Sequence, residues 1–460
     1  MKNRFIGDRA FYRRVFLIAI PIIIQNGITH FVTLLDNIMV GQLGDTQMSG
    51  VSVVNQFIFI FNLCIFGANS GPGIFTAQFF GSGDHAGVRH SFRFKFLACS
   101  FIGIAGVLLF IPLGDTLIST FLQGEGTVQQ IAQTKAFGRE YLHMSLWGLF
   151  PFAISNVYCS TLRECGQTRI PMLAGISAVL TNLALNWVLI FGNLGMPTMG
   201  VRGAALATVV SRYVELAIVV LWTHRHKKDY PFIQGAYRSM HIPGVLLKRI
   251  TLKGMPLLLN ELVWAMGITM LNQCYSTCGF HVVSATNITS TISNLASVVT
   301  MALGNTVGIL IGQLLGSGAS EQTVRDSNRK LTALSVALGF LFGGLLIAIA
   351  GVFPKLYNVS PDVRTLSTQL ILVIACMKPF HTYMYSGYFT LRSGGKSFIT
   401  FLYDGGFLWA FTVPLAYILS RFTDIGILPL YILCQLPDIA KCLMGYILIR
   451  KGSWIQNLTK

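Results

Sequence analysis

Residues Gly73–Gly83 read GIFTAQFFGSG, and Gly308–Gly318, 235 positions later, read GILIGQLLGSG. The same distance separates PIIIQ at Pro21–Gln25 from PLLLN at Pro256–Asn260. A third pair of similar segments, TLR at 161–163 and at 390–392, follows in the same order at a distance of 229. Matches in one order and at nearly one distance indicate an internal duplication. The chain is therefore predicted to consist of two homologous halves.

The repeated glycine-rich segment is typical of helix ends that pack closely. Small residues four positions apart let helix backbones approach each other in lipid, and Gly-Ser-Gly is a common way to end a helix. We therefore expect these glycines to be structural. Gln78 and Gln313, at equivalent positions of the two segments, are alternatively candidates to line a polar path.

The sequence between these segments is too apolar for a soluble protein. Apolar residues make up 53% of the 460 positions and charged residues 11%, whereas soluble proteins have about a quarter of their residues charged. Apolar runs long enough to cross a bilayer, about 20 residues each, occur twelve times. Their approximate ranges are 15–40, 50–72, 96–114, 141–160, 169–192, 200–222, 251–275, 283–313, 331–353, 367–389, 398–419 and 425–449. We expect 283–313, rich in Ser, Thr and Asn, to be the weakest by hydropathy.

The basic residues predict the orientation of these spans. Of the 34 Lys and Arg residues, 25 fall in the N-terminal segment, in loops from even- to odd-numbered spans, or at the C-terminus. Such an excess places both termini in the cytoplasm. It also accounts for the net charge of +17 without nucleic acid, which would require a basic face on a soluble domain.

These observations predict an all-α integral membrane protein of twelve transmembrane helices in two six-helix lobes. An even number of spans per half gives both halves the same orientation, as in transporters with parallel repeats. The predicted boundaries are an N-lobe at 1–222, a cytoplasmic linker at 223–250 and a C-lobe at 251–460. The nine cysteines lie mostly in apolar runs, so we expect small buried side chains and no metal or disulfide.

Asp36 is the most informative ionisable residue of the N-half. A carboxylate at bilayer depth costs about 2.5–3.5 kcal/mol, so it persists where it faces a polar cavity or changes its protonation. Asp36 lies about 30 Å along the first span, has no basic neighbour in sequence, and corresponds by the repeat to approximately Asn272. Because burial disfavours a charged carboxylate, we expect Asp36 to take up a proton from outside and release it inside.

A second group of ionisable residues occurs in the C-half: Glu261, Lys378, Asp404 and Asp438. Two interpretations are open. The acids could form a cation or substrate site, or Lys378 could hold one of them in a fixed ion pair. Arg212 and Glu215, three positions apart in the N-half, have the spacing of a local ion pair on a helix.

Five segments together resemble one transporter family: LLDNIMVG at 34–41, AQFFGSGD at 77–84, LRECGQT at 162–168, NLALN at 182–186 leading to IFG at 190–192, and GVRGAALAT at 200–208. In this order they resemble the multidrug and toxic compound extrusion (MATE) transporters of bacteria, over nearly the whole chain. The resemblance implies a V-shaped pair of lobes around a central cavity. It also implies export of organic cations or other amphipathic compounds by alternating access, driven by H⁺ or Na⁺, with no cofactor. We expect a monomer in the bacterial plasma membrane.

The resemblance also implies a cation site in the N-lobe. Many bacterial members carry an acid on the first helix and Asn, Asp and Thr on the fifth and sixth, which correspond here to Asp36, Asn182, Asn186 and Thr208. Several members have Asp where this chain has Asn186. With one carboxylate fewer, protonation of Asp36 is favoured over direct binding of Na⁺.

Three alternatives remain beside the exporter. One is a flippase for lipid-linked oligosaccharides from the same superfamily, and another is a channel. The third is a membrane-embedded prenyl or glycosyl transferase, which would need clustered aspartates for a metal-bound phosphate. The sequence contains no such cluster, no Walker loop, no His-Glu-x-x-His and no Gly-x-Ser-x-Gly, so we expect no enzymatic activity.

Overall fold

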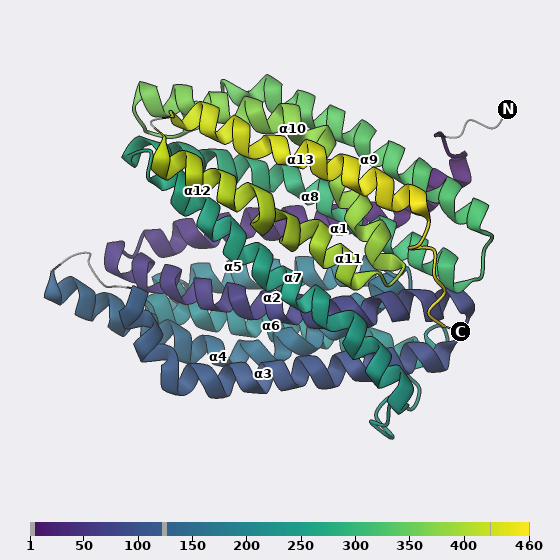
Figure 1. Cartoon of the computed structure of the whole chain (residues 1–460). Coiled ribbons are helices and arrows are strands. Elements are labelled where there is room, and N and C mark those ends of the chain that lie inside the picture. Colours follow the sequence, from purple (N-terminus) through teal and green to yellow (C-terminus); the bar gives the residue numbers. More distant parts are fainter. Residues whose placement is uncertain (1–4, 122–126, 424, 460) are drawn as a thin grey trace. The chain divides into compact units, whose positions relative to one another are not determined.

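The computed structural model describes residues 5–121, 127–423 and 425–459, and these form helices and connecting loops (Figure 1). The long helices of the first half are α1 (Arg9–Gly41), α2 (Asp45–Ser82), α3 (His85–Phe121), α4 (Val128–Glu164), α5 (Arg169–Phe191) and α6 (Gly200–Arg225). Those of the second half are α7 (Gly244–Ser276), α8 (Phe280–Gly316), α9 (Glu321–Ala350), α10 (Pro361–Ser393), α11 (Ser397–Phe401), α12 (Val413–Phe422) and α13 (Ile427–Lys451). Two π-helical segments, Leu402–Gly406 and Leu408–Thr412, join α11 to α12. Short 3₁₀ helices are Asn193–Gly195, Pro231–Ile233 and Phe353–Leu356.

The helices agree in number with the twelve predicted spans, because α11, the π-helical segments and α12 form one continuous helix, 397–422. Within the described ranges, eleven helices are long and apolar enough to cross a membrane, and α4 is not among them. Between Val128 and Glu140, α4 contains three glutamines and three charged residues. The expectation that 283–313 would be the weakest span was therefore wrong. The hydroxyls of α8 bond within the helix, as Thr289 does to the Ala285 carbonyl (2.8 Å), and this makes them compatible with lipid.

The helices are longer than the bilayer requires. α2 has 38 residues and α3, α4 and α8 have 37 each, which corresponds to about 55 Å, whereas the hydrocarbon core is about 30 Å thick. Their ends therefore extend beyond the bilayer. This is why Arg89, Arg93 and Lys95, which the sequence predicted in a loop, lie within the first turns of α3.

The contacts divide the chain into two compact units. The first contains the chain up to Ile23, Ala77–Asp84 and the chain from Arg249 onward; the second contains Ile24–Thr76 and His85–Lys248. The chain therefore passes between units inside α1, α2 and α7, close to Pro21 in α1 and Pro72 in α2. The two units are defined by contacts between residues, whereas the predicted lobes are defined by the sequence repeat. The lobe boundaries therefore stay a prediction.

Equivalent contacts occur in both units, as the repeat predicts. In the second unit, Gln25 of α1 accepts a hydrogen bond from Arg163 (2.8 Å) and packs against Gly175 of α5, where a Cβ would lie 2.8 Å from the Gln25 amide nitrogen. In the first unit, Asn260 of α7 packs in the same way against Gly405, where a Cβ would lie 2.9 Å from the Asn260 amide oxygen. The duplication is therefore preserved in packing as well as in sequence.

The repeated glycine-rich segments cross each other within the first unit. A Cβ added to Gly81 would collide with the Gln313 carbonyl, and one added to Gly316 would collide with the Gln78 carbonyl. The predicted close approach of two helices is confirmed, and the contact is reciprocal. Both helices need glycine here because each backbone touches the other.

The two glutamines of these segments are engaged in packing. Gln78 is fully buried, donates to the carbonyls of Ser393 (2.9 Å) and Gln456 (3.1 Å), and accepts from the Leu458 amide (2.6 Å). Gln313 accepts from Arg14 (2.9 Å). Gln78 therefore holds the segment that follows α13, rather than lining a polar path.

The predicted linker is folded onto α3 in the second unit. Arg93 donates to three carbonyls of the linker, those of Gly235 (2.8 Å), Ala236 (2.8 Å) and His241 (3.0 Å). Phe232 of the linker is 2% exposed and its ring lies 5.7 Å from that of Phe92. The hydrogen bonds from Arg93 to the linker backbone and the contact between the two phenylalanine rings therefore hold the linker against α3.

Candidate functional site

The second unit brings together the four polar residues predicted for the N-half. Asp36 lies on α1, Asn182 and Asn186 lie one turn apart on α5, and Thr208 lies on α6. Residues four apart share one face of a helix, so both asparagines point the same way. They are 6% and 1% exposed, respectively, and Asp36 is half-buried.

Amide groups surround the Asp36 carboxylate. Asn186 Nδ2 donates to Asp36 Oδ1 at 2.6 Å. With its amide nitrogen toward the carboxylate, Asn182 lies 2.9 Å from both Asp36 oxygens and accepts from the Thr208 hydroxyl at 3.2 Å. Both carboxylate oxygens therefore have donors, and the donors are uncharged.

Asp36 has no salt bridge to any described residue. Arg212 is the cation that acts electrostatically on Asp36. Arg212 is itself paired with Glu215 at 3.1 Å and lies over the Phe152 ring, 4.8 Å from its centroid. The predicted local pair of Arg212 and Glu215 is thus present. Asp36 is therefore balanced by amide dipoles, with no fixed positive charge in contact.

The cluster also contains an acceptor without a donor. Asn186 Oδ1 is buried and has no hydrogen-bond partner among the described residues. Buried polar groups are normally satisfied, so an open acceptor beside a carboxylate is a place where a proton or a small cation would be stabilised. Among the described residues, no three His, Cys, Asp or Glu side chains gather as a metal site, and a single carboxylate suits a monovalent ion better than a divalent one.

In the first unit, Asp404 is held by a lysine and an amide. Lys441 Nζ lies 2.8 Å from Asp404 Oδ1, and Asn260 Nδ2 donates to Oδ2 at 3.0 Å. Asp404 sits in the π-helical segment Leu402–Gly406, and Asn260 Oδ1 accepts the Gly405 N–H at 2.9 Å. π-Helical turns often occur at functional sites. The fixed ion pair predicted as one interpretation exists, but its cation is Lys441.

Lys378 and Glu261 have other surroundings. Lys378, 2% exposed, donates to Ser297 at 3.2 Å and has no acidic partner in the part of the chain that is described. Glu261 lies one residue from Asn260 and accepts from Tyr388 at 3.5 Å, a long contact. Glu261 has no salt bridge among the described residues, so it remains the C-half acid most available to a moving ion.

Asp438 lies on α13, three positions before Lys441, and Asn272 lies on α7. His381 Nε2 approaches Asp438 Oδ2 at 3.2 Å. Asn272 is exposed and forms no hydrogen bond with the described residues. Asn272, the residue that the repeat pairs with Asp36, therefore has no cluster of polar partners like the one around Asp36.

The sequence interpretation missed a buried ion pair in the second unit. Lys95 of α3 is fully buried, forms an ion pair with Glu164 of α4 and also donates to Ser160 (3.2 Å) and Thr161 (3.3 Å). Lys95 was counted among loop residues because α3 begins earlier than the predicted span. One available signal was its position 235 residues before Lys330, the distance of the repeat.

Twelve helices within the described residues, arranged in two repeats, together with a half-buried carboxylate that has no salt bridge, are typical of a membrane transporter. The MatE family model matches residues 21–188 and again 256–418, once in each half. The chain therefore belongs to the MatE family, a family of transporters and not of enzymes.

The chain is similar to curated relatives and to solved structures over nearly its full length. The chain is 24% identical over 438 residues to "Probable multidrug resistance protein NorM" of Thermotoga maritima, covering 95% of this chain and 92% of that protein. It is 22% identical over 435 residues to "Probable multidrug resistance protein YoeA" of Bacillus subtilis, covering 92% and 89%. A solved structure of an outward-facing multidrug resistance MATE family transporter of the MOP superfamily superposes with a TM-score of 0.86 at 18% identity, covering 98% of this chain and 97% of that one. This likeness confirms the predicted all-helical transporter fold.

Proposed function

We propose that this protein is an antiporter that exports amphipathic organic compounds, above all organic cations, in exchange for H⁺, with Asp36 as the coupling carboxylate. It acts as a monomer in a bacterial plasma membrane with both termini in the cytoplasm. The observation that carries the proposal is the half-buried Asp36, surrounded by uncharged amides and without a salt bridge among the described residues. The relatives are named as probable multidrug resistance proteins, which supports the export of drugs. The preference for amphipathic organic cations follows from the family resemblance.

The hydrogen bonds around Asp36 favour a proton over Na⁺ as the coupling ion. The amide groups of Asn186 and Asn182 point their N–H donors at the carboxylate oxygens that a sodium ion would need as ligands. To bind a proton, one Asp36 oxygen is enough, and only one amide N–H must give up its hydrogen bond to that oxygen. A metal ion needs several oxygen ligands at the same time. Na⁺ remains the alternative coupling ion, and Asn186 Oδ1 would then be one of its ligands.

Efflux of a fluorescent organic cation from proteoliposomes with imposed gradients tests the proposal. We expect a pH gradient to drive efflux, a Na⁺ gradient alone to have no effect, and Asp36→Asn to reduce transport to the passive leak. Asp362→Asn, which removes an exposed acid from the first turn of α10, is the matched control and should transport normally.

Glu261 offers a second position for coupling, and the same assay separates the two. Normal gradient-driven efflux in Asp36→Asn, together with loss in Glu261→Gln, would transfer the coupling role to Glu261 and overturn the proposal. Efflux driven by Na⁺ with no response to pH would overturn the choice of ion only.

A further inference from the structure

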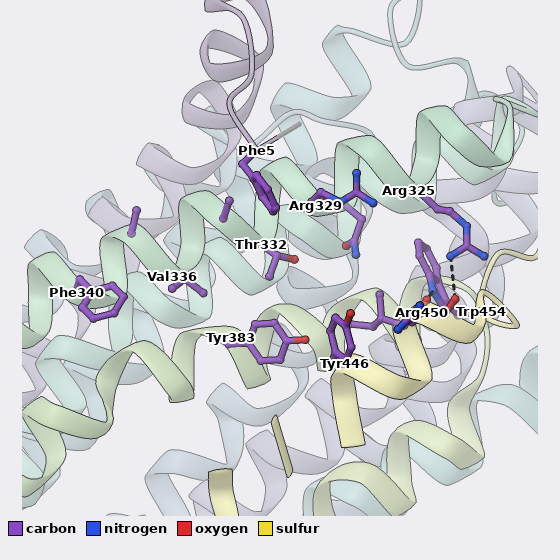
Figure 2. Close-up of a pocket in the computed structure, with 14 residues that line it drawn as sticks. Phe5, Arg325, Arg329, Thr332, Val336, Phe340, Tyr383, Tyr446, Arg450 and Trp454 are labelled. Carbon is purple, nitrogen blue, oxygen red and sulfur yellow. Dashed lines mark hydrogen bonds between the residues drawn. The ribbon is translucent and has the colours of Figure 1, made fainter. Parts of the chain in front are cut away.

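A groove of about 830 Å³ lies on the first unit between α9, α10 and α13 (Figure 2). Its wall is formed mainly by α9, with Tyr383 from α10 and Tyr446 from α13. The volume lies within the range of small-molecule sites. None of the proposed transport residues lines it.

The chemistry of the groove changes steadily along α9. Arg325 and Arg329 lie near the start of the helix, Thr332 follows, and Val336 and Phe340 complete the stripe. These spacings of three and four keep the side chains on one face, and the distance from first to last is about 22 Å. Figure 2 shows the arginines at one end and Phe340 at the other. A charged head at one end and an apolar wall along the remainder match the two parts of a lipid.

The charged end has a surplus of positive charge. Arg325 pairs with Glu321 (2.6 Å) and Arg329 with Asp326 (3.3 Å). Arg450, at the end of α13, is exposed and has no acidic partner among the described residues. No acidic residue lines the groove. Because Arg325 and Arg329 are paired, the surplus is the charge of Arg450, and this charge attracts an anion to the open end.

Arg325 and Arg450 are also held side by side. The Arg325 guanidinium donates to the Arg450 carbonyl at 3.0 Å. This bond fixes the end of α13 against α9. Figure 2 shows the Arg325 and Arg450 side chains at the same end of the groove. Planar guanidinium groups bind phosphate oxygens in a bidentate manner.

The apolar end is exposed in a way that suits lipid. Phe340 is 67% exposed, and Val336, one turn earlier on α9, is partly exposed. Large exposed apolar residues on a membrane helix face acyl chains at no cost, whereas in water they would form an unfavourable patch. The arginines belong to the face predicted to be cytoplasmic, where anionic lipids are concentrated and basic pockets between helices bind their head groups.

We propose that this groove binds one anionic phospholipid, with its phosphate at Arg450, beside the paired Arg325 and Arg329, and an acyl chain along Val336 and Phe340. The occupant is anionic because the surplus charge at this end is the positive charge of Arg450, and it is a lipid because the apolar wall continues from the charged end. An organic cation, the substrate class proposed above, would be repelled by the same arginines. The bound lipid would join α9 to α13 on the surface of the first unit.

Native mass spectrometry of the full-length protein, taken from nanodiscs of mixed phosphatidylglycerol and phosphatidylethanolamine, tests the proposal. We expect one retained phosphatidylglycerol per protein. Arg450→Gln should lower its retention about fivefold, the effect of one basic residue near an anionic surface. Lys451→Gln is the matched control, because Lys451 is the next residue, carries the same charge, is exposed and does not line the groove. Its retention of lipid should equal that of the unmodified protein.

A second variant tests the apolar half without a change in charge. Ala337 is exposed and lines the groove, so Ala337→Trp should fill the path of the acyl chain and lower lipid retention while the protein stays folded. Loss of the bound species on addition of inorganic phosphate would identify a free anion site and overturn the proposal. Equal retention of phosphatidylethanolamine, equal losses in Arg450→Gln and Lys451→Gln, or unchanged retention in Ala337→Trp would also overturn it.

Discussion

Asn186 controls the Asp36 carboxylate more directly than any other side chain, through the 2.6 Å hydrogen bond between them. In Asn186→Asp, two carboxyl groups would lie at hydrogen-bond distance, and both cannot be charged without a cation between them. We expect this variant to gain Na⁺-stimulated efflux, because a second carboxylate supplies the ligands that the natural site lacks. Transport in proteoliposomes with and without a Na⁺ gradient measures the change.

The variant Asn186→Ala provides the comparison for that experiment. It removes the same hydrogen bond and adds no carboxylate, so efflux should weaken without any response to Na⁺. If Asn186→Asp and Asn186→Ala respond equally to Na⁺, the ion preference is set elsewhere in the molecule.

Lys441 stabilises the fold through Asp404, with which it forms a 2.8 Å ion pair that is largely buried. Removing one partner of a buried pair leaves an uncompensated charge, so Lys441→Met should lower the free energy of unfolding by about 3 kcal/mol. The double variant Lys441→Met with Asp404→Asn should recover much of this loss, since both charges are then absent. Thermal unfolding of the purified protein in detergent measures both. Equal stability of the single and double variants would contradict the assignment of Asp404 as a structural partner.

The crossing of α2 and α8 depends on two glycines at equivalent positions of the repeat. Because a Cβ at Gly316 would overlap the Gln78 carbonyl, Gly316→Ala must push the two helices apart, and we expect a strong loss of folded protein. Gly344→Ala on α9 is the matched control. Gly344 is exposed and has open space around its Cβ position, and an alanine in an exposed helix favours the helix by about 0.5–1 kcal/mol.

Fluorescence-detected size-exclusion chromatography reports the outcome for both glycine variants. Gly316→Ala should give a reduced monodisperse peak, and Gly344→Ala should match or exceed the unmodified protein. A normal peak for Gly316→Ala would mean that the helices can separate without cost at this crossing.

At the scale of the whole molecule, the distribution of Lys and Arg predicts that both ends of the chain face the cytoplasm. A fluorescent protein fused after Lys460 should therefore fluoresce, and alkaline phosphatase at the same position should be inactive, because it folds only outside the cytoplasm. Fusion after Gly195, in the short connection between α5 and α6, is the reciprocal control and should give the opposite result. If the same reporter is active at both positions, the predicted topology is contradicted.

The number of helices and the duplication could be predicted from the sequence because both depend on local pattern. Apolar runs are read directly from the chain, and the distance of 235 appears in aligned segments such as Gly73–Gly83 and Gly308–Gly318. Asp36 was named from its depth in the first span, and Asn182, Asn186 and Thr208 were named from a family resemblance. The structure brings all four together. Their role in coupling remains a prediction.

Side-chain partners across helices could not be predicted, because they depend on how each helix is rotated. Lys378 and Lys441 both lie inside helices of the C-half, and only the structure distinguishes the one that meets Asp404. Lys95 was missed for a related reason: hydropathy marks where a helix enters lipid and not where the helix begins. The order of hydropathy, in contrast, depends on composition alone and could have been predicted. Three glutamines and three charged residues between Val128 and Glu140 lower the hydropathy of α4, whereas α8 keeps a mean hydropathy of 1.8.

The passage of the chain between its two compact units inside α1, α2 and α7 has a consequence for biosynthesis. Ribosomes add about 5–20 residues per second, so the segment ending at Ile23 leaves the ribosome roughly ten seconds or more before residues beyond Arg249 exist to receive it. Arg14 cannot form its hydrogen bond until Gln313 has been synthesised, and Gln78 cannot accept from the Leu458 amide until residue 458 has been synthesised. The first unit therefore cannot be completed until residue 458 has been synthesised. Until then, the newly made helix ends need either a chaperone or a tolerant lipid environment.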